Sequence, residues 1–361
     1  AIIERQPHVD LVVGTDHIHD IPELVGRVLA GEGPLVAVDS SAEISGELTS
    51  HVSGRVSAYV SVMRGCDQFC TYCIVPYVRG REKSRSVESI VGEVEALSAA
   101  GSREVFLLGQ NITAYGLAEL RREGTIDDHV SPFSDLLRAV HDVPGIQRIR
   151  FTSPHVKYMN QAFVDTVCEL PKVCSAFHIP LQSGSDRLLR LMRRGYTVSD
   201  YLGRVSEIRS RLGRVSFSTD VIVGFPSETD EDFLATREAM AEAGFEMAYI
   251  FRYSPRAGTK AEEDLVDDVP TAVKEERNQI LLHDLEVRAE RQNQDYLDEV
   301  VEVLVEGPSK RNQERWTGRT DTNKVCIFEP CQGVAQGKLV DLLVERTTSH
   351  ALYGVVRPSP G

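Results

Sequence analysis

The spacing of apolar residues changes along the chain, and the changes mark its predicted elements. Between residues 55 and 255, short runs rich in β-branched residues alternate with longer segments that carry apolar residues at helical spacing. We predict strands at the short runs and helices at the longer segments. The six predicted strands lie at 55–63, 104–111, 148–154, 176–182, 216–226 and 246–255. Strands that alternate with helices form parallel sheets with right-handed crossovers, so the pattern predicts an α/β fold, a partial (β/α)6 barrel.

The pattern is different on both sides of this region. A charged amphipathic helix is predicted over 272–297, and strand-like alternation of apolar and polar residues follows it. Short strands at 300–309, 315–322, 324–330 and 338–357 predict a small antiparallel β-barrel. At the start of the chain we predict a buried strand without a nearby partner (9–15), a short helix (21–31) and a polar linker (32–54). We therefore expect three parts, at residues 1–50, 52–290 and 293–358.

Composition limits what the protein can be. Of its 361 residues, 42% are hydrophobic and 26% are charged, which is typical of a globular protein. No apolar run approaches the roughly 20 residues of a membrane span, so we expect no membrane partner. Seven cysteines without a secretory signal favour a reducing compartment, hence the cytoplasm. The net charge of −14 argues mildly against nucleic acid, although the local distribution of charge matters more than its sum.

Three cysteines stand close together in the run GCDQFCTYCIVPYVRG, directly after the first predicted barrel strand. Cys66, Cys70 and Cys73 have the spacing C-x3-C-x2-C. Four thiolates normally hold a 4Fe-4S cluster, so three on one short loop would leave one iron without a protein ligand. An open coordination position is typical of catalytic metal sites. In such barrels the chemistry lies at the C-terminal ends of the strands, which is where this loop begins.

Other uses of three cysteines agree less well with the sequence. Zinc requires four ligands, and no histidine follows at finger spacing, since the next one is His129. A disulfide would leave an odd thiol. Buried core cysteines do not suit a loop marked by Gly65, Pro76 and Gly80. The four remaining cysteines are expected to be structural, namely Cys168, Cys174, Cys326 and Cys331.

Polar residues follow several of the predicted barrel strands. The second strand ends in Gly109-Gln110-Asn111, the third in Thr152-Ser153-Pro154-His155 and the fourth in Gln182-Ser183-Gly184-Ser185, and the fifth carries Asp220. Amide and hydroxyl groups supply donors and acceptors for an amino acid moiety, a ribose or an adenine. Each of these residues alone fits a turn or helix cap equally well. Their repetition at several strand ends favours a ligand site.

Several motifs resemble those of one enzyme family. The cysteine spacing resembles that of the radical S-adenosylmethionine (SAM) enzymes. LLGQNITAYG, FHIPLQSGSDRLLRLMRRGYT, STDVIVGFPSETDEDF and YSPRAGT resemble the methylthiotransferases, and the resemblance extends from about residue 9 to the C-terminus. GRTDTNKVCIF in the predicted small barrel resembles a TRAM domain, an RNA-binding module. LLGQN and the TRAM segment resemble the tRNA-modifying branch of the methylthiotransferases.

The resemblance implies a chemistry and a set of residues. A 4Fe-4S cluster on Cys66, Cys70 and Cys73 is expected to bind SAM. Reductive cleavage of the bound SAM is expected to give a 5′-deoxyadenosyl radical. The radical is expected to remove hydrogen from C2 of a modified adenosine beside the tRNA anticodon. A methylthio group then replaces that hydrogen, with a second SAM supplying the methyl. Strand-end position and the resemblance together give the residues expected to contact SAM: Tyr72, Gln110, Gln182, Ser183, Arg194 and Asp220.

The resemblance also implies parts that this sequence does not hold. The family carries an N-terminal domain with three further cysteines, which bind a second 4Fe-4S cluster linked to sulfur insertion. The first cysteine here is Cys66, so residues 1–50 are expected to be the end of that domain and its linker. Cleavage of SAM without sulfur insertion is then one expected behaviour of this chain. A flavodoxin or ferredoxin is the expected electron donor, and the protein is expected to be a monomer.

Two basic runs bear on the expected tRNA partner. Residues 79–85 and 310–324 are rich in lysine and arginine, which is ordinarily a solvated surface. Beside a TRAM resemblance, such runs favour phosphate contacts. The residues expected to bind RNA are Lys310, Arg311, Arg315, Arg319 and Lys324. Two other functions stay open: the same chemistry on an aspartate of a ribosomal protein, and an RNA-binding protein whose cysteines hold zinc.

Overall fold

The computed structural model describes residues 2–38, 55–124, 129–310 and 312–357. Its largest part holds six parallel strands, in two sheets of order β3-β6-β7 and β8-β9-β10. Isolated bridges, such as the one between Thr152 and His178, join the two sheets into one curved wall. This confirms the predicted (β/α)6 barrel. The strands are β3 (Ser57–Ser61), β6 (Glu104–Leu108), β7 (Arg148–Phe151), β8 (Ala176–His178), β9 (Ser216–Val223) and β10 (Met247–Arg252).

This large barrel is open on one side. Its two edge strands, β3 and β10, do not pair with each other, and within the described residues each has only one neighbouring strand. The side chains on the inner face of β10 are consequently exposed, as the burial pattern of that strand records. A barrel of this kind has an interior that a ligand can enter from the side.

Helices cover the outer face of the strands, and their ends follow from the sequence. The Ser86 hydroxyl accepts the N3 amide at the start of α4 (Val87–Ala99), and Thr229 with Asp232 forms a capping box at the start of α10 (Asp230–Ala243). The helices bury their apolar faces against the strands in one continuous core. The other crossover helices are α6 (Pro132–His141), α7 (Gln161–Glu169), α8 (Asp186–Leu191) and α9 (Val198–Leu212). Three helices of at most seven residues were not predicted because they are too short to show a helical period: α3 (Val75–Arg79), α5 (Leu117–Glu123) and α11 (Lys260–Asp264).

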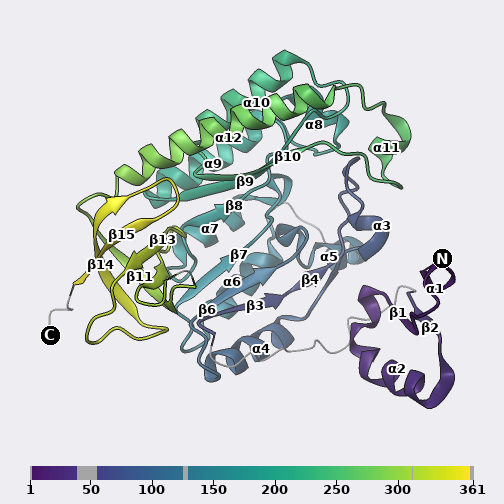
Figure 1. Ribbon diagram of the computed structural model, residues 1–361, viewed down its shortest axis with the longest axis horizontal. Helices are drawn as coiled ribbons and strands as arrows, with labels where there is room; N and C mark the ends of the chain where they lie inside the picture. The colour runs from purple at the N-terminus through teal and green to yellow at the C-terminus, as the bar shows by residue number, and fades with distance from the viewer. Residues whose placement is uncertain (1, 39–54, 125–128, 311, 358–361) are drawn as a thin grey trace.

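The long helix predicted over 272–297 is confirmed as α12 (Thr271–Gln294). It packs along β10 and leads from the large barrel into the small one (Figure 1). Among the described helices, none combines the length and the apolarity that a membrane crossing requires.

The small barrel is closed, with strand order β11-β12-β13-β15-β14. All its pairings are antiparallel except that of β13 with β15, which is parallel. The prediction of an antiparallel barrel therefore needs this correction, because an odd number of strands cannot alternate in direction around a closed ring. The segment predicted as one strand over 338–357 is a hairpin of two. The strands are β11 (Val300–Pro308), β12 (Trp316–Arg319), β13 (Val325–Phe328), β14 (Leu339–Thr347) and β15 (Leu352–Arg357).

Two arginines at the start of β7 attach the small barrel to the large one. Arg148 and Arg150 are each 3% exposed. Arg150 donates to the carbonyl oxygens of Thr320 (2.7 Å) and Asp321 (2.9 Å), and its Nε donates to the Glu104 carboxylate (2.7 Å). Arg148 donates to the carbonyl oxygen of residue 319 (2.5 Å). The loop after β12 is thus fixed at the N-terminal ends of the barrel strands.

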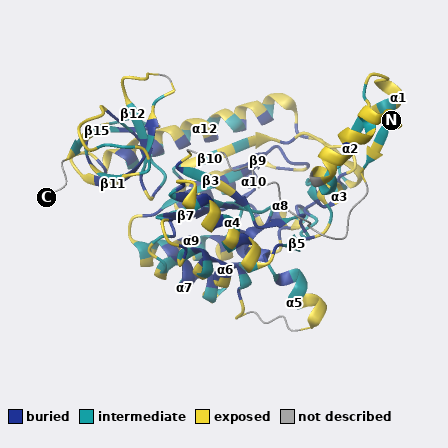
Figure 2. Ribbon diagram, turned by 90° about the horizontal axis from the view of Figure 1, so that it is seen from below, coloured by how far each residue is buried: buried dark blue, intermediate teal, exposed yellow. Residues whose placement is uncertain are grey.

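The N-terminal segment differs from the prediction. β1 (Leu11–Val13) pairs in parallel with β2 (Leu35–Ala37), so the strand predicted without a partner has one, and the partner comes from the predicted linker. A strand of three residues is too short to stand out in an otherwise polar stretch. The predicted helix is confirmed as α2 (Ile21–Arg27) and the π-helical turn that follows it, and residues 39–54 lie outside the described ones. The segment is largely exposed and lies at the opposite end of the large barrel from the small one (Figures 1 and 2).

Candidate active site

A short hairpin carries the three cysteines at the C-terminal end of β3. β4 (Met63–Arg64) pairs antiparallel with β5 (Lys83–Ser84), so the residues between them form a closed loop. Gly65 begins this loop with φ +80°, and a Cβ there would lie 2.1 Å from the carbonyl oxygen of Arg81. Only glycine fits this position. The amide of Cys66 can then donate to the carbonyl oxygen of Gly80 (3.2 Å).

Buried groups hold the cysteine loop on both sides. The Thr71 hydroxyl donates to the carbonyl oxygen of Leu191 at the end of α8 (2.9 Å). On the other side, the Glu82 carboxylate accepts the Asp67 amide (3.1 Å) and the side-chain amide of Asn111 (3.4 Å). Burial raises the pKa of Glu82 above its ordinary value. Because these contacts come from protein groups alone, the loop has a fixed shape before any ligand binds.

The three thiols lie at the inner side of this loop. Cys66 and Cys70 are 9% and 6% exposed, and Cys73 is half-buried. Burial raises the pKa of Cys66 to about 12 and also raises the pKa of Cys73. Thiols bind metals as thiolates, so loading of iron would release protons. Arg194 donates from Nη1 to Sγ of Cys70 (3.4 Å), which places a positive charge beside the ligand sulfur.

The arrangement of these thiols bears on the alternative of a single bound zinc ion. In the part of the chain that the structure describes, no group of three or more His, Cys, Asp or Glu side chains is placed to hold one metal ion. In a 4Fe-4S cluster each thiolate binds its own iron, so its ligands stand farther apart than those of one zinc ion. The geometry gives no support to the zinc alternative.

A cavity of about 250 Å³ lies beside Cys73. Three of the residues predicted to contact SAM line it, namely Tyr72, Gln182 and Asp220. Its other walls are Ile222 and the stretch from Phe251 to Ser254, followed by Arg256. The structure therefore brings together the cysteine loop, the end of β9 and the YSPRAGT motif, which lie far apart in the sequence.

The other three predicted SAM contacts take different positions. Arg194 binds Cys70 as described. Ser183 is 0% exposed, and its hydroxyl lies 3.3 Å from that of Thr236, so it packs the strand-end loop against α10 and does not line the cavity. Gln110 follows β6, and its side-chain oxygen is buried without a hydrogen-bond partner among the described residues.

A second unsatisfied buried atom occurs at the same end of the barrel. His155 follows β7 and is 4% exposed; its Nδ1 accepts the amide of Lys157 (3.3 Å), while Nε2 has no partner among the described residues. Burial lowers the pKa of His155 well below its ordinary value, so the ring is neutral and carries its proton on Nε2. Unpaired buried polar groups are costly. Neither Gln110 nor His155 lines the cavity beside Cys73. In chemistry alone, the acceptor of Gln110 and the donor of His155 match an ammonium and a carboxylate, both of which SAM carries.

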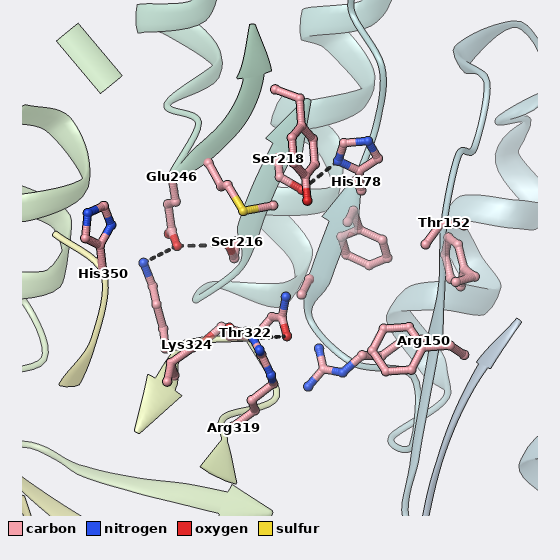
Figure 3. Close-up of a pocket in the computed structure, with 18 of the residues that line it drawn as sticks. Arg150, Thr152, His178, Ser216, Ser218, Glu246, Arg319, Thr322, Lys324 and His350 are labelled. Atoms are coloured by element: carbon pink, nitrogen blue, oxygen red, sulfur yellow. Dashed lines mark hydrogen bonds and ion pairs between the residues drawn. The ribbon is translucent and has the colours of Figure 1, made fainter. Parts of the chain in front are cut away.

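A larger cavity of about 610 Å³ lies between the two barrels (Figure 3). Asp220 lines both cavities, so they meet at this residue. Nδ1 of His178 lies 3.0 Å from the Ser218 hydroxyl, and its Nε2 lies 3.4 Å from the Asp220 carboxylate. These polar groups stand on the inner faces of β8 and β9. His178 was not predicted as a site residue, because the strand was expected to continue to residue 182, whereas β8 ends at His178.

The residues predicted to bind RNA fall into two groups. Lys310 and Arg315 are exposed on the small barrel, and Arg311 lies outside the described residues. Arg319 and Lys324 instead line the larger cavity. Lys324 forms an ion pair of 2.5 Å with Glu246 of the large barrel, as Figure 3 shows.

The first basic run is not the continuous surface that the sequence indicated. Arg85 is 9% exposed and pairs with Glu93 (2.6 Å). Arg81 is exposed but pairs with Asp67 of the cysteine loop (2.7 Å). The run therefore frames the cysteine loop, and Arg85 is not available for a phosphate.

Known proteins share this architecture at the level of sequence. The family model of the radical SAM superfamily matches residues 60–240, and that of the TRAM domain matches residues 294–356. A relative from Opitutus terrae, named tRNA-2-methylthio-N(6)-dimethylallyladenosine synthase, is 43% identical over 98% of this chain and 79% of its own length. A relative of the same name from Akkermansia muciniphila is 42% identical over 100% of this chain and 81% of its own. The chain belongs to this synthase family.

Membership of the synthase family confirms the predicted resemblance, the fold and the class of enzyme. As a radical SAM protein, a synthase of this kind uses a 4Fe-4S cluster and SAM. The position of the three cysteines in the synthase agrees with that requirement. The roles of the individual cavity and RNA residues stay predictions.

Proposed function

We propose that the protein attaches a methylthio group to C2 of N6-dimethylallyladenosine at position 37 of tRNA, next to the anticodon. The names and the high identity of the relatives support this proposal. A TRAM domain attached to the catalytic barrel supports tRNA as the substrate. The observation that carries the proposal is the position of the Cys66–Cys73 loop against a cavity lined by Tyr72, Gln182 and Asp220.

Residues of the chain would hold the two cofactors. Cys66, Cys70 and Cys73 would bind the cluster, and the cavity beside Cys73 would bind SAM. Together the cluster and SAM supply a one-electron cleavage whose product removes hydrogen from carbon. Arg194 provides a charge-assisted hydrogen bond to one ligand sulfur. Gln110 offers an acceptor to the ammonium of SAM, and His155 offers a donor to its carboxylate.

Protection of a reactive intermediate is a further task of the protein. A primary carbon radical attacks most C–H bonds that it meets, so the site must hold the substrate close and exclude water. Apolar walls, among them Ile222 and Tyr253, flank the cavity beside Cys73. They favour the exclusion of solvent at the place where SAM would lie.

The proposal is tested with protein reconstituted with iron and sulfide under anaerobic conditions. Addition of SAM and dithionite should release 5′-deoxyadenosine, measured by liquid chromatography and mass spectrometry. A Cys70→Ala variant should release none. Stoichiometric zinc without iron in anaerobically purified protein, or a Cys70→Ala variant that still cleaves SAM, would contradict the proposal.

Nucleoside analysis of tRNA tests the substrate. tRNA from a strain without the gene should lack 2-methylthio-N6-dimethylallyladenosine, and the complete gene should restore it. Unchanged levels of this nucleoside would favour the alternative substrate, an aspartate of a ribosomal protein.

The remaining parts of the system are also proposals. A second 4Fe-4S cluster would be held by cysteines that precede Ala1 in the complete protein. A flavodoxin or ferredoxin would supply the electrons. The protein would act as a monomer in the cytoplasm, where tRNA is modified, with domain limits near residues 50, 290 and 293.

A further inference from the structure

The inner face of β10 exposes large apolar side chains. Met247, Tyr249 and Phe251 are 43%, 53% and 52% exposed, whereas Ala248 and Ile250 between them pack against the core. β10 is an edge strand of the open barrel, and no strand of the described chain pairs along its free side. Exposed apolar surface of this kind marks a binding site more often than it serves the fold.

The exposed aromatic rings connect the two cavities. Tyr249 lines the larger cavity, and Phe251 lines the smaller one beside Cys73. Their rings are nearly parallel, with an interplanar angle of 20° and centroids 6.4 Å apart. Tyr249 is paired in register with Asp220, the residue that belongs to both cavities. A flat ligand on Tyr249 would therefore lie at the boundary of the SAM cavity.

The same place offers one hydrogen-bond acceptor. Asp220 uses one carboxylate oxygen toward His178, and its other oxygen has no partner in the described chain. His178 is fixed in turn by Ser218, and its ring packs edge-on to Tyr249 with centroids 5.8 Å apart. The carboxylate is 27% exposed, so it is oriented and accessible. Such a group accepts a hydrogen bond from an N–H donor and repels a carbonyl oxygen.

One part of the larger cavity has an apolar wall. Phe106, Phe151 and Met247 form this wall together with the Tyr249 ring, whereas polar side chains, among them those of Glu246 and Lys324, line the rest. An apolar wall next to the Asp220 carboxylate suits a flat base that carries one N–H and a hydrocarbon group. An adenine alkylated at N6 has this chemistry, since its N6 bears one hydrogen and one hydrocarbon chain.

We infer that the larger cavity binds the target base. Tyr249 stacks on the base, the free oxygen of Asp220 accepts its N6–H, and the apolar wall receives the N6 hydrocarbon. This inference rests on the proposed function and names the residues that select its substrate. Guanine and hypoxanthine present a carbonyl at the corresponding position, so Asp220 rejects them. Because Asp220 borders both cavities, a base bound to it lies next to the SAM cavity.

Equilibrium binding of RNA tests the inference without requiring turnover. The ligands are anticodon stem-loops with N6-dimethylallyladenosine, adenosine or inosine at position 37, measured by fluorescence anisotropy. We expect the wild type to bind the dimethylallyl form about tenfold more tightly than the adenosine form. Tyr249→Ala should weaken binding of the dimethylallyl and the adenosine forms alike, by about tenfold or more, because both lose the stack on the base. Tyr249→Phe should keep the wild-type affinity for both forms, because the ring is retained.

The carboxylate is tested with the inosine ligand. The wild type should bind the adenosine form more tightly than the inosine form, and Asp220→Leu should bind both equally. Val266→Ala is the matched control, since Val266 is 80% exposed and lines neither cavity. It should keep the wild-type preferences.

Each outcome separates this inference from the proposed function. A wild type without preference, a Tyr249→Ala variant with wild-type affinities, or an Asp220→Leu variant with the wild-type preference for adenosine over inosine would place the base elsewhere. In that case release of 5′-deoxyadenosine by the reconstituted wild type still upholds the proposed function. If the folded wild type holds a cluster but releases no 5′-deoxyadenosine, the proposed function is wrong, whatever the RNA-binding data show.

Discussion

The two barrels of this protein use their interiors in opposite ways. The small barrel is closed and filled, and Val303, Cys326 and Leu352 in its core are all 0% exposed. The large barrel is open between β3 and β10, and its inner face leaves Tyr249 and Phe251 about half exposed. A closed barrel of few strands has room only for its own side chains. It can bind partners only on its outer surface, whereas the open barrel can hold a ligand inside.

The same difference separates the cysteines. Cys326 lies in the core of the closed barrel, where burial raises its pKa to about 12 and no ligand can reach it. The loop of Cys66, Cys70 and Cys73 stands instead at the rim of the open barrel, next to a cavity. Burial of a thiol thus says little by itself, since Cys66 and Cys70 are also buried. The cavity next to the cysteine loop distinguishes Cys66, Cys70 and Cys73 from Cys326.

The largest expected effect follows from this contrast. Cys70→Ala should abolish the release of 5′-deoxyadenosine, because one iron would lose its protein ligand. Cys326→Ala should keep iron content and SAM cleavage and should lower the free energy of unfolding by about 1 kcal/mol, because it leaves a small cavity. Iron analysis and chemical denaturation measure the two effects. Loss of iron in the Cys326→Ala protein would contradict the distinction between Cys326 as a structural cysteine and Cys70 as a cluster ligand.

The next effect concerns the joint between the barrels. Arg150→Ala breaks the buried ion pair with Glu104, whose carboxylate keeps the Ser57 hydroxyl as a donor, and it removes the hydrogen bonds to the carbonyl oxygens of Thr320 and Asp321. Removal of one partner of a buried ion pair costs about 3–5 kcal/mol. We expect urea denaturation to show a loss of this size. Arg204→Ala is the control, since its pair with Glu207 is partly exposed and should contribute less than about 1 kcal/mol. Equal losses in the two variants would mean that the joint is not rigid.

A smaller effect is expected at the rim of the open barrel. Although burial acts in the other direction, hydrogen bonds from Arg187, Ser185 and Thr229 lower the pKa of Asp232 to about 2. Because its folded pKa is depressed, Asp232 stabilises the protein fully above its unfolded pKa of 3.8 and loses this effect as the pH falls toward 2.

Asp232→Asn should therefore destabilise the protein by about 2 kcal/mol at pH 7. The difference in the free energy of unfolding between Asp232→Asn and the wild type should be smaller at pH 3 than at pH 7, as measured by urea denaturation at both pH values. Asp142→Asn, at a side chain that is 86% exposed, is the control and should change stability by less than about 0.5 kcal/mol. A gap that stays constant with pH would show that Asp232 acts by packing and not by charge.

The smallest effects should appear on the outer surface of the closed barrel. Arg315→Ala should weaken tRNA binding a few-fold and reduce the salt slope by about one unit, because it is exposed and free to contact a phosphate. Lys324→Ala should change tRNA affinity less than about twofold, because its charge is already paired with Glu246. Binding at several salt concentrations measures both. A larger effect of Lys324→Ala would show that RNA contacts Lys324 in spite of its ion pair with Glu246.

The sequence predicted those features that depend on local pattern. The six barrel strands and the long helix follow from periodicity, and the cysteine loop follows from spacing. Periodicity cannot show which strand stays unpaired at an edge, so the exposed face of β10 was not foreseen. The three-residue strand β2 was missed because so short a run has no pattern of its own.

Two predicted site residues have contacts that the sequence did not indicate, and the cause is the same for both. Lys324 belongs to a basic run on the small barrel, but its partner Glu246 lies on the large one. Ser183 stands at a strand end, but its hydroxyl is used by Thr236 of a later helix. In both cases the deciding neighbour is remote in the chain, and only the packed structure brings it close.

Arg148 and Arg150 donate hydrogen bonds to the main-chain carbonyl oxygens of residues 319–321 and to none of the side chains of these residues. Every amino acid supplies the same carbonyl group, so these hydrogen bonds do not depend on which side chains the loop carries. A substitution of Asp321, which is exposed, can therefore change the surface of this loop while the main-chain attachment of the two barrels is kept.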